Sequence, residues 1–354
     1  MTNMSPKTKQ GLYAWGRSEM IPALPVTDRH EIVGQCLAAL AGATVPDLNP
    51  LAGDLLRSDT SLTGIMAALG GDVKASPVTS PDLGAAVGEA LRIIAISLDK
   101  VRDLGHRRLC RMFGIRDFQE RSIPFHQPLT LGTIGESGEI PAVSGGVNWA
   151  SCKLETVGGI LTFSRQAVLA ADWPLLASIA QEMIDAADRS ERQACFDLLN
   201  RNPTLHDGLP MFDASRGNIA STTGNPSVST LENAMIALSD LTENGARLGL
   251  QPSFIVVPTH YAMSTAILLD AGLDRLLSGS ETPVIHDPSL SGDAWYLLPD
   301  PDRRPVVGLA HLGNATDPVI DRKPQFSSDG IGIRVRHSYG ACALSPHAIK
   351  VLIS

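Results

Sequence analysis

The feature that most constrains the fold is a polar arm that runs directly into a long amphipathic helix. Residues 126–165 are rich in Gly, Ser and Thr and hold few large apolar side chains. Their turn residues and β-formers are typical of an extended hairpin, yet such a hairpin has too few anchors to be stable alone. We therefore expect another copy of the same chain to cover the arm, which predicts a building block rather than a catalyst.

The helix that follows is predicted over residues 173–200, with Asp172 as a cap and Pro174 in its first turn. Its apolar positions recur at helical spacing and are Leu176, Ile179, Met183, Ile184, Ala187, Ala194 and Leu198. Its opposite side is kept polar by Asp185, Asp188, Arg189, Glu191 and Arg192. At about 1.5 Å per residue the rod is about 42 Å long, so we expect it to act as a spine.

The rest of the chain predicts a mixture of helices and strands. A capping box at 229–232 should start a helix, and a buried strand (253–257), a second helix (259–272) and several further strands should follow. In the C-terminal region, apolar residues alternate with Arg334 and Arg336, which predicts a strand with one solvated face. Upstream, short helices are expected, one of them near 28–42, and a longer helix is expected over 82–113.

Composition excludes several classes of protein. The 354 residues carry a net charge of −8, which argues against a chain that binds nucleic acid over its whole surface. The first 20 residues contain no apolar signal region, and no run of about 18 apolar residues occurs. We expect no membrane partner and a protein made in the cytoplasm.

A local basic stretch could still contact nucleic acid, although the net charge argues against binding over the whole surface. Arg107, Arg108 and Arg111 lie close together in sequence, with Phe113 and Phe118 nearby. Basic residues interleaved with aromatic ones are typical of a nucleic-acid contact. The simpler interpretation is a solvated face, or one that pairs with acidic residues of a neighbouring subunit.

The cysteines predict no metal centre. The five residues Cys36, Cys110, Cys152, Cys195 and Cys342 are widely spaced, with no CxxC pair. This spacing fits neither a disulfide framework nor a zinc module, so reduced thiols in packed positions are expected.

The motifs of common enzymes are absent from the sequence. The string GESGE at 135–139 has Glu139 where a nucleophile elbow needs Gly, and neither a Walker A loop nor HExxH occurs. His206 and Asp207 beside Asp213 could in principle contact a metal, but LHDGLPMFD is typical of a tight turn. We expect no catalytic, cofactor-binding or metal residues. A hydrolase that uses Ser137 or the His206, Asp207 and Asp213 group is the alternative from another class.

The order of these elements resembles the Hong Kong 97-type fold of tailed-phage major capsid proteins. Several strings sharpen the resemblance to the branch of Mu-like prophage head subunits and capsid proteins encoded with a prohead protease. They are GESGEIPA, FSRQAVLAADWPLL, NPTLHDGLPMFDASRGNIA, PSFIVVPTHYAMSTAILL, DAWYLLPDPDRRPVVGLAHL and SSDGIGIRVRHSYGACAL. Arg216 stands where relatives often have His, and AADW replaces a more acidic pair. The resemblance covers about residues 79–354.

The resemblance implies an α+β fold with five parts. They are an N-terminal extension (1–78), an N-arm helix region (79–125), the extended loop (126–165), a peripheral domain with the spine helix (166–230 and 315–354) and an α/β axial domain (231–314). The loop should reach over a neighbouring subunit. Residues expected at contacts between subunits are Glu136, Glu139, Trp149, Lys153 and Arg165. The basic residues Arg107, Arg108 and Arg111 could then form an inner face.

The resemblance also implies a non-enzymatic function without cofactors. The chain should self-assemble into hexamers and pentamers of an icosahedral shell that encloses double-stranded DNA, as part of the virion capsid made in the cytoplasm of a bacterial host. A portal, a scaffold or a prohead protease would take part in assembly, and packaged DNA would be contacted without sequence specificity. An encapsulin-like or gene-transfer-agent shell of the same fold is the close alternative.

Overall fold

The computed structural model describes residues 26–40, 45, 47–58, 89–90, 105–126, 138, 146–164, 173–270, 284–313, 315–325 and 330–353. The chain divides into two compact units. The first unit comprises residues 1–103, 157–188 and 317–337, and the second comprises residues 104–156, 189–316 and 338–354. Three elements, α8 (Trp173–Arg201), β4 (Glu155–Ser164) and β12 (Gly330–Ala343), begin in one unit and end in the other.

The first unit contains a pair of short helices, α2 (Val26–Leu40) and α3 (Pro50–Ser58). Ile32, Val33 and Leu37 of α2 are fully buried, which confirms the apolar face that the sequence predicted. The loop between the helices is fixed by a backbone N–H of Asn49, which donates to Gln35 Oε1 at 2.8 Å.

The strands of the first unit show the predicted alternation. β11 (Val319–Gln325) pairs antiparallel with the first part of β12, with Ile320 opposite Val335. Ile333 and Val335 are buried, whereas Arg334 and Arg336 point to solvent and both pair with Asp321, at 2.7 and 3.0 Å. The predicted strand with one wet face is confirmed.

Strand β4 also pairs with β12, and a glycine controls how closely the two approach. A Cβ atom on Gly158 would lie 2.6 Å from the carbonyl oxygen of Val335, closer than van der Waals contact allows. A Cβ atom on the adjacent Gly159 would meet only Met183 Cε of α8, at an ordinary 3.6 Å. Gly158 is therefore required for the contact between strands, and Gly159 is not.

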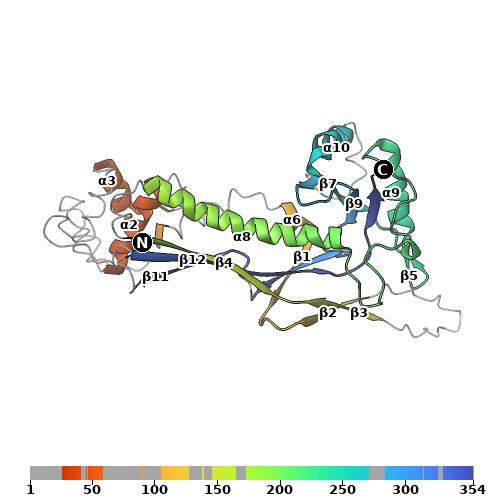
Figure 1. Ribbon diagram of the computed structural model, residues 1–354, viewed down its shortest axis with the longest axis horizontal. Helices are drawn as coiled ribbons and strands as arrows, with labels where there is room; N and C mark the ends of the chain where they lie inside the picture. Colours follow the sequence, from red (N-terminus) through yellow and green to blue (C-terminus); the bar gives the residue numbers. More distant parts are fainter. Residues whose placement is uncertain are drawn as a thin grey trace. The chain divides into compact units, whose positions relative to one another are not determined.

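The second unit holds most of the regular structure (Figure 1). Its strands are β1 (Cys110–Ile115), β2 (Arg121–His126), β3 (Val147–Cys152), β5 (Thr242–Glu243), β6 (Ala246–Arg247), β7 (Pro252–Pro258), β8 (Val284–Asp287), β9 (Ala294–Pro299), β10 (Val307–Leu312) and β13 (Ile349–Leu352). Its helices are α6 (Gly105–Leu109), α9 (Val228–Asp240) and α10 (Ala262–Leu268), with short 3-10 turns η2 (Ala214–Arg216) and η3 (Thr259–Tyr261). The mixture of helices with largely antiparallel strands confirms the α+β class.

Two sheets organise the second unit. In one, β1 pairs parallel with β10, which pairs antiparallel with the last part of β12. In the other, the strand order is β13-β9-β7-β8, and helices α9 and α10 lie beside it (Figure 1). Leu231 and Leu238 of α9 pack with Val257, Trp295 and Ile349 of this sheet in one apolar cluster. The predicted buried strand is β7, whose residues are all buried.

Two expectations about boundaries are wrong. The predicted helix over 82–113 ends at Leu109 in the described residues, because 110–115 pair with β10 as strand β1. Helix α9 is capped by Ser227 rather than Ser229: its side chain accepts from the Thr230 N–H, and Thr230 Oγ1 accepts from the Ser227 N–H at 2.9 Å. The proposed Asp172 cap of α8 lies outside the described residues. Among the described helices, none combines the length and apolar character needed to cross a membrane.

We predict that Gly158→Ala lowers the free energy of unfolding by about 2 kcal/mol, because the added methyl must displace the backbone of β12. The matched control is Gly159→Ala, one residue away on the same strand, which should stay within about 0.5 kcal/mol. Chemical denaturation of the two variants measures the difference. Equal denaturation midpoints would show that the close approach is not needed.

Candidate functional site

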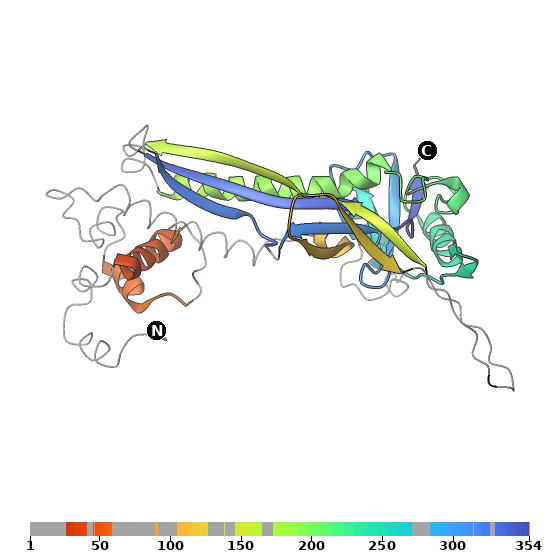
Figure 2. The same ribbon diagram turned by 90° about the horizontal axis from the view of Figure 1, so that it is seen from below.

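The base of the predicted hairpin is well defined. Strand β2 pairs antiparallel with β3, from Arg121 opposite Cys152 to His126 opposite Val147, and in the described chain the two strands form a sheet of their own (Figure 2). Arg121 is ion-paired with Asp117, four residues before it. A two-stranded sheet is marginally stable by itself. The base of the hairpin therefore depends on its contacts with the rest of the second unit.

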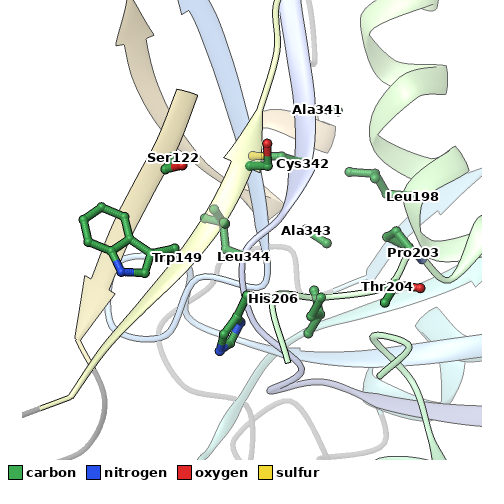
Figure 3. A pocket seen from close by; sticks show the side chains of 13 residues that line it. Ser122, Trp149, Leu198, Pro203, Thr204, His206, Ala341, Cys342, Ala343 and Leu344 are labelled. Carbon is green, nitrogen blue, oxygen red and sulfur yellow. The ribbon is translucent and has the colours of Figure 1, made fainter. Parts of the chain in front are cut away.

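A cavity of about 400 Å³ lies at this base (Figure 3). Its walls come from Trp149 of β3, Leu205 and His206 of the loop after α8, and Cys342 and Leu344 at the end of β12. Trp149 is 51% exposed as a residue, although it lines the cavity. A hollow of this size with mostly apolar walls is suited to bind apolar groups.

The structure places two of the five predicted contact residues. Trp149 is at the cavity, and Lys153 is exposed between the end of β3 and the start of β4. Glu136, Glu139 and Arg165 lie outside the described residues. The contact role of all five residues stays a prediction.

The three basic residues are each engaged within the chain. Arg107 binds the carboxylate of Glu191, and the guanidinium of Arg108 lies 5.9 Å from the centre of the Phe254 ring. Arg111 pairs with Asp302 at 2.9 Å across an exposed surface. Arg108 and Arg111 are exposed, whereas Arg107 is mostly covered, so the three do not present one free cationic face.

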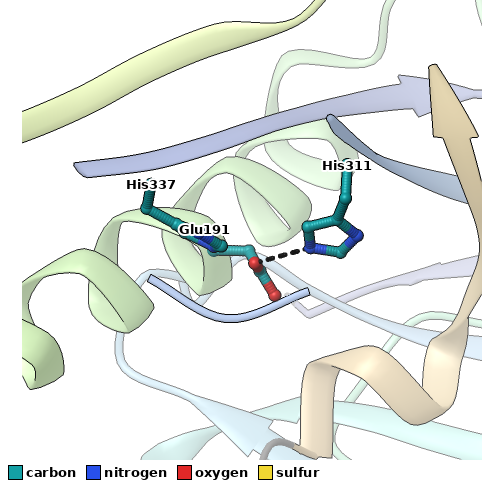
Figure 4. A group of neighbouring side chains, drawn as sticks. All are labelled: Glu191, His311 and His337. Carbon is teal, nitrogen blue, oxygen red and sulfur yellow. Dashed lines mark hydrogen bonds and ion pairs between the residues drawn. The ribbon is translucent and has the colours of Figure 1, made fainter. Parts of the chain in front are cut away.

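A buried charge cluster centred on Glu191 was not predicted. Glu191 is fully buried, and its carboxylate contacts His106 Nε2 at 2.8 Å. It also contacts His311 Nε2 at 3.0 Å (Figure 4). The Nε of Arg107 donates to Oε1 of the same carboxylate at 2.7 Å, and its Nη2 donates to the carbonyl of Thr316 at 2.7 Å. A buried carboxylate is stable only when it is paired and hydrogen-bonded in this way.

The sequence did contain a signal for this cluster. Glu191 lies four residues from both Ala187 and Cys195, which are buried, so it occupies the apolar stripe of α8. Its assignment to the polar side was wrong, and so was that of Asp188, which is also buried. A charged residue within an apolar stripe indicates a buried partner.

The last turns of α8 fasten the second sheet to the helix. Arg192 Nε pairs with the buried carboxylate of Asp287 at 2.9 Å. The amide of Asn200 donates to the Ser289 carbonyl at 2.7 Å, and the hydroxyl of Tyr296 donates to the Leu199 carbonyl at 3.2 Å. Two side chains and one backbone carbonyl within three turns of one helix thus bind the end of β8, the turn after it and strand β9.

The loop after α8 uses its acidic residues for its own structure. Arg216 donates to Asp207 at 2.6 Å, and this hydrogen bond holds the pKa of the Asp207 carboxyl below its ordinary value. The Asp213 carboxylate accepts from the Ser215 backbone at 2.8 Å and begins η2. The rings of His206 and Phe125 are nearly perpendicular, with their centres 6.0 Å apart. The tight turn predicted from the sequence is confirmed, and Ser137 lies outside the described residues.

A second acidic contact joins the hairpin base to the C-terminal strand region. Glu243 Oε1 accepts from the amide of Asn148 at 3.1 Å, and its Oε2 lies 3.1 Å from His347 Nε2. Burial would raise the pKa of the Glu243 carboxyl, but His347, Asn148 and Arg304 together lower it below its ordinary value. The carboxylate is therefore favoured in the folded state.

All five cysteines are buried, as predicted, and each is a free thiol. Cys36 lies in the helix pair, where its sulfur is 3.5 Å from the Ala52 carbonyl. Burial raises the pKa of the Cys36 thiol to about 12, so it stays protonated.

We predict that Glu191→Gln lowers the free energy of unfolding by about 3–5 kcal/mol, because Arg107 loses the counter-charge of a fully buried carboxylate. The control is Glu232→Gln on α9, where the side chain is exposed and the change should stay within about 0.5 kcal/mol. Urea denaturation followed by tryptophan fluorescence reports both values. If the two variants unfold at the same urea concentration, the cluster does not stabilise the fold.

We predict that Glu243 makes the stability of the fold depend on pH. The pKa of the Glu243 carboxyl is lower in the folded state than in the unfolded state. Its stabilising contribution is therefore present in full above the pKa that Glu243 has in the unfolded chain, and it is lost as pH falls through the pKa of the folded state. In Glu243→Gln, the loss of thermal stability between about pH 5 and pH 3 should be shallower than in the unmodified chain. Glu232→Gln again serves as the control, and an unchanged slope in Glu243→Gln would contradict the assignment.

Comparisons with known structures give distant similarities. A chain of Mycobacterium phage Bobi is 13% identical, with a TM-score of 0.47, and the match covers 70% of this chain and 90% of that chain. The capsid of a native GTA particle is 11% identical, with a TM-score of 0.47 and coverage of 72% and 91%. The capsid structure of the cyanophage P-SCSP1u is 11% identical, with a TM-score of 0.45 and coverage of 70% and 87%.

Comparison of the sequence with protein-family profiles identifies the family of the chain. None of the curated proteins matches it. The profile of the family described as phage capsid protein matches residues 150–352, more than half of the chain. This match runs from the end of β3 through the spine helix α8 to β13 and leaves out β1 and β2, and it confirms the predicted resemblance to tailed-phage capsid proteins. The chain belongs to the phage capsid protein family.

Proposed function

We propose that this capsid protein is the major head subunit of a phage or prophage-derived particle, and that it assembles into hexamers and pentamers of an icosahedral shell around double-stranded DNA. The observation that carries the proposal is the family match over 150–352, and it is supported by the β2–β3 sheet, which pairs with no other described strand and leaves Trp149 51% exposed. Strands without an adjacent sheet are stabilised when another surface covers them. In a capsid that surface is supplied by the next subunit, and contacts that close around an axis produce rings.

The proposal assigns five parts to the chain. Residues 126–165 form the extended loop, with 166–230 and 315–354 as the peripheral domain and 231–314 as the axial domain. Residues 1–78 and 79–125 form the N-terminal extension and the N-arm. Glu136, Glu139, Trp149, Lys153 and Arg165 contact neighbouring subunits, and the exposure of Trp149 supports its place in this set.

The charge of the chain suits a container for DNA. A net charge of −8 limits non-specific attraction to phosphates, so packaged DNA can be both held and released. The inner basic face stays part of the proposal through Arg108 and Arg111, which are exposed, whereas Arg107 is occupied by Glu191. A portal, a scaffold and a prohead protease are the expected partners during assembly in a bacterial host.

A structural role also agrees with the loop after α8. Asp207 and Asp213, two of the residues that the hydrolase alternative requires, accept hydrogen bonds from Arg216 and Ser215 within their own loop. Their charges thus serve local structure. We propose that the protein acts by assembly and catalyses no reaction.

The test is to replace residues 128–145 with a short Gly-Ser turn that keeps β2 paired with β3. The second unit should still fold, because the paired residues from Arg121 to His126 and from Val147 to Cys152 remain. We expect particles to be lost, since the part that reaches a neighbour is gone. Negative-stain microscopy and sedimentation measure assembly.

Two controls make the result interpretable. The thermal melting temperature of the variant should match that of the unmodified chain, which shows that the subunit is folded. Glu232→Gln, an exposed change on α9, should assemble normally. Normal particles from the loop variant would overturn the proposed role, and nuclease-protected DNA in the unmodified particle distinguishes a phage head from an enzyme-filled shell.

A further inference from the structure

A single Asn–Gly pair occurs in the chain, at Asn244 and Gly245. It forms the tip of a hairpin, because β5 and β6 pair with Glu243 opposite Ala246 and leave only these two residues to make the turn. Both have positive φ, 53° for Asn244 and 77° for Gly245, which is typical of a type I′ turn. Both residues are exposed, so the peptide bond between them is open to solvent.

An exposed Asn–Gly pair can react with itself. The backbone nitrogen of the Gly attacks the side-chain carbonyl carbon of the Asn, because Gly has no Cβ atom to hinder the approach. The new C–N bond closes a five-membered succinimide ring, the bond to the side-chain nitrogen breaks, and that nitrogen leaves as ammonia with the proton of the attacking amide. Water then adds to one of the two ring carbonyls, and the ring opens to aspartate or to isoaspartate, so solvent water is the only co-reactant.

The stability of the hairpin controls how often this reaction starts. Ring closure brings the Gly245 nitrogen onto the Asn244 side chain, which needs a rotation about the Asn244 Cα–C bond that opens the turn. Only two residue pairs hold β5 to β6, and these strands pair with no other described strand. A two-stranded ladder of this length is marginally stable, so it opens locally at a small cost in free energy.

The residue before the turn links two parts of the second unit. Glu243 accepts from the Asn148 amide of the hairpin base at 3.1 Å, and its other oxygen lies 3.1 Å from His347 Nε2. Asn148 and His347 are both buried, so the carboxylate reaches from an exposed hairpin into the unit. Isoaspartate lengthens the backbone of a two-residue turn and shifts the register of β5 against β6. Either product also adds a negative charge beside Glu243.

We propose that Asn244 is a site of spontaneous deamidation, and that its products weaken the link that Glu243 makes between the hairpin base and the C-terminal strand region. Because water is the only co-reactant, the modified fraction grows with the age of the protein. The hairpin base carries the proposed extended loop, so the importance of this change for particles rests on the proposed function. The reaction at Asn244 does not depend on it.

The experiment incubates the unassembled full-length chain at mildly alkaline pH, which favours loss of the proton from the attacking amide. Trypsin releases residues 217–247 as one peptide, which contains Asn218, Asn225, Asn233 and Asn244, and its fragmentation in a mass spectrometer locates each exchange of an amide for a carboxyl. We expect deamidation at Asn244 on the order of tenfold faster than at Asn233. Asn233 is the matched control, since it is also exposed but lies in α9, where its amide donates to the Ser229 carbonyl at 2.9 Å.

One variant separates the reaction from its consequence. Asn244→Gly has no side-chain amide, and Gly adopts positive φ without strain, so the turn is kept. After the same incubation, the unmodified chain should melt roughly 2–4 °C lower than before, whereas Asn244→Gly should keep its melting temperature. The loss of stability between about pH 5 and pH 3 should also become shallower in the aged unmodified chain and approach that of Glu243→Gln.

Two results would overturn the proposal. The modification site is wrong if Asn244 deamidates no faster than Asn233. The link to Glu243 is wrong if the aged unmodified chain and aged Asn244→Gly have the same melting temperature and the same pH dependence. Both measurements use unassembled protein, so their failure is distinct from a failure to form particles.

Discussion

One buried carboxylate holds the second unit together. Glu191 lies in the apolar stripe of the spine helix and binds His106, Arg107 and His311 at once. Leaving this charge without partners in the protein interior would cost several kcal/mol, so the segments that supply those partners must be in place whenever the unit is folded. Other residues of α8 make further contacts of this kind, since Arg192 and Asn200 bind the end of β8 and the turn that follows it.

The parts of the fold that rest on local patterns were predictable. The spine helix, the fully buried strand β7 and the alternation around Val335 follow from the spacing of apolar residues, and the structure confirms them. Pairing between distant segments was not predictable. The sequence predicted that the helix over 82–113 would include the first residues of 110–115. These residues form strand β1 instead, because β10 provides a parallel partner about 200 residues away.

The candidate site shows the same division. Trp149 was selected from its position in a polar arm, and it lies at the cavity. The cavity itself could not be inferred, because its walls come from β2, β3, the loop after α8 and the end of β12. Glu191 was missed for a related reason: a buried charge is defined by its partners, and a linear pattern does not contain them. Glu191 carried one usable signal, its place among Ala187 and Cys195.

The parallel pair of β1 and β10 has a consequence for the order in which the chain folds. β1 follows α6 early in the sequence, but its partner, and the β12 strand on the far side of that partner, emerge from the ribosome much later. Loop closure over such separations is slow, and a nascent chain cannot complete this sheet before synthesis is nearly finished. Unfinished subunits therefore lack the framework on which the hairpin base is mounted. For a self-assembling protein, this timing delays association until each copy is whole, and truncated products are kept out of the growing particle.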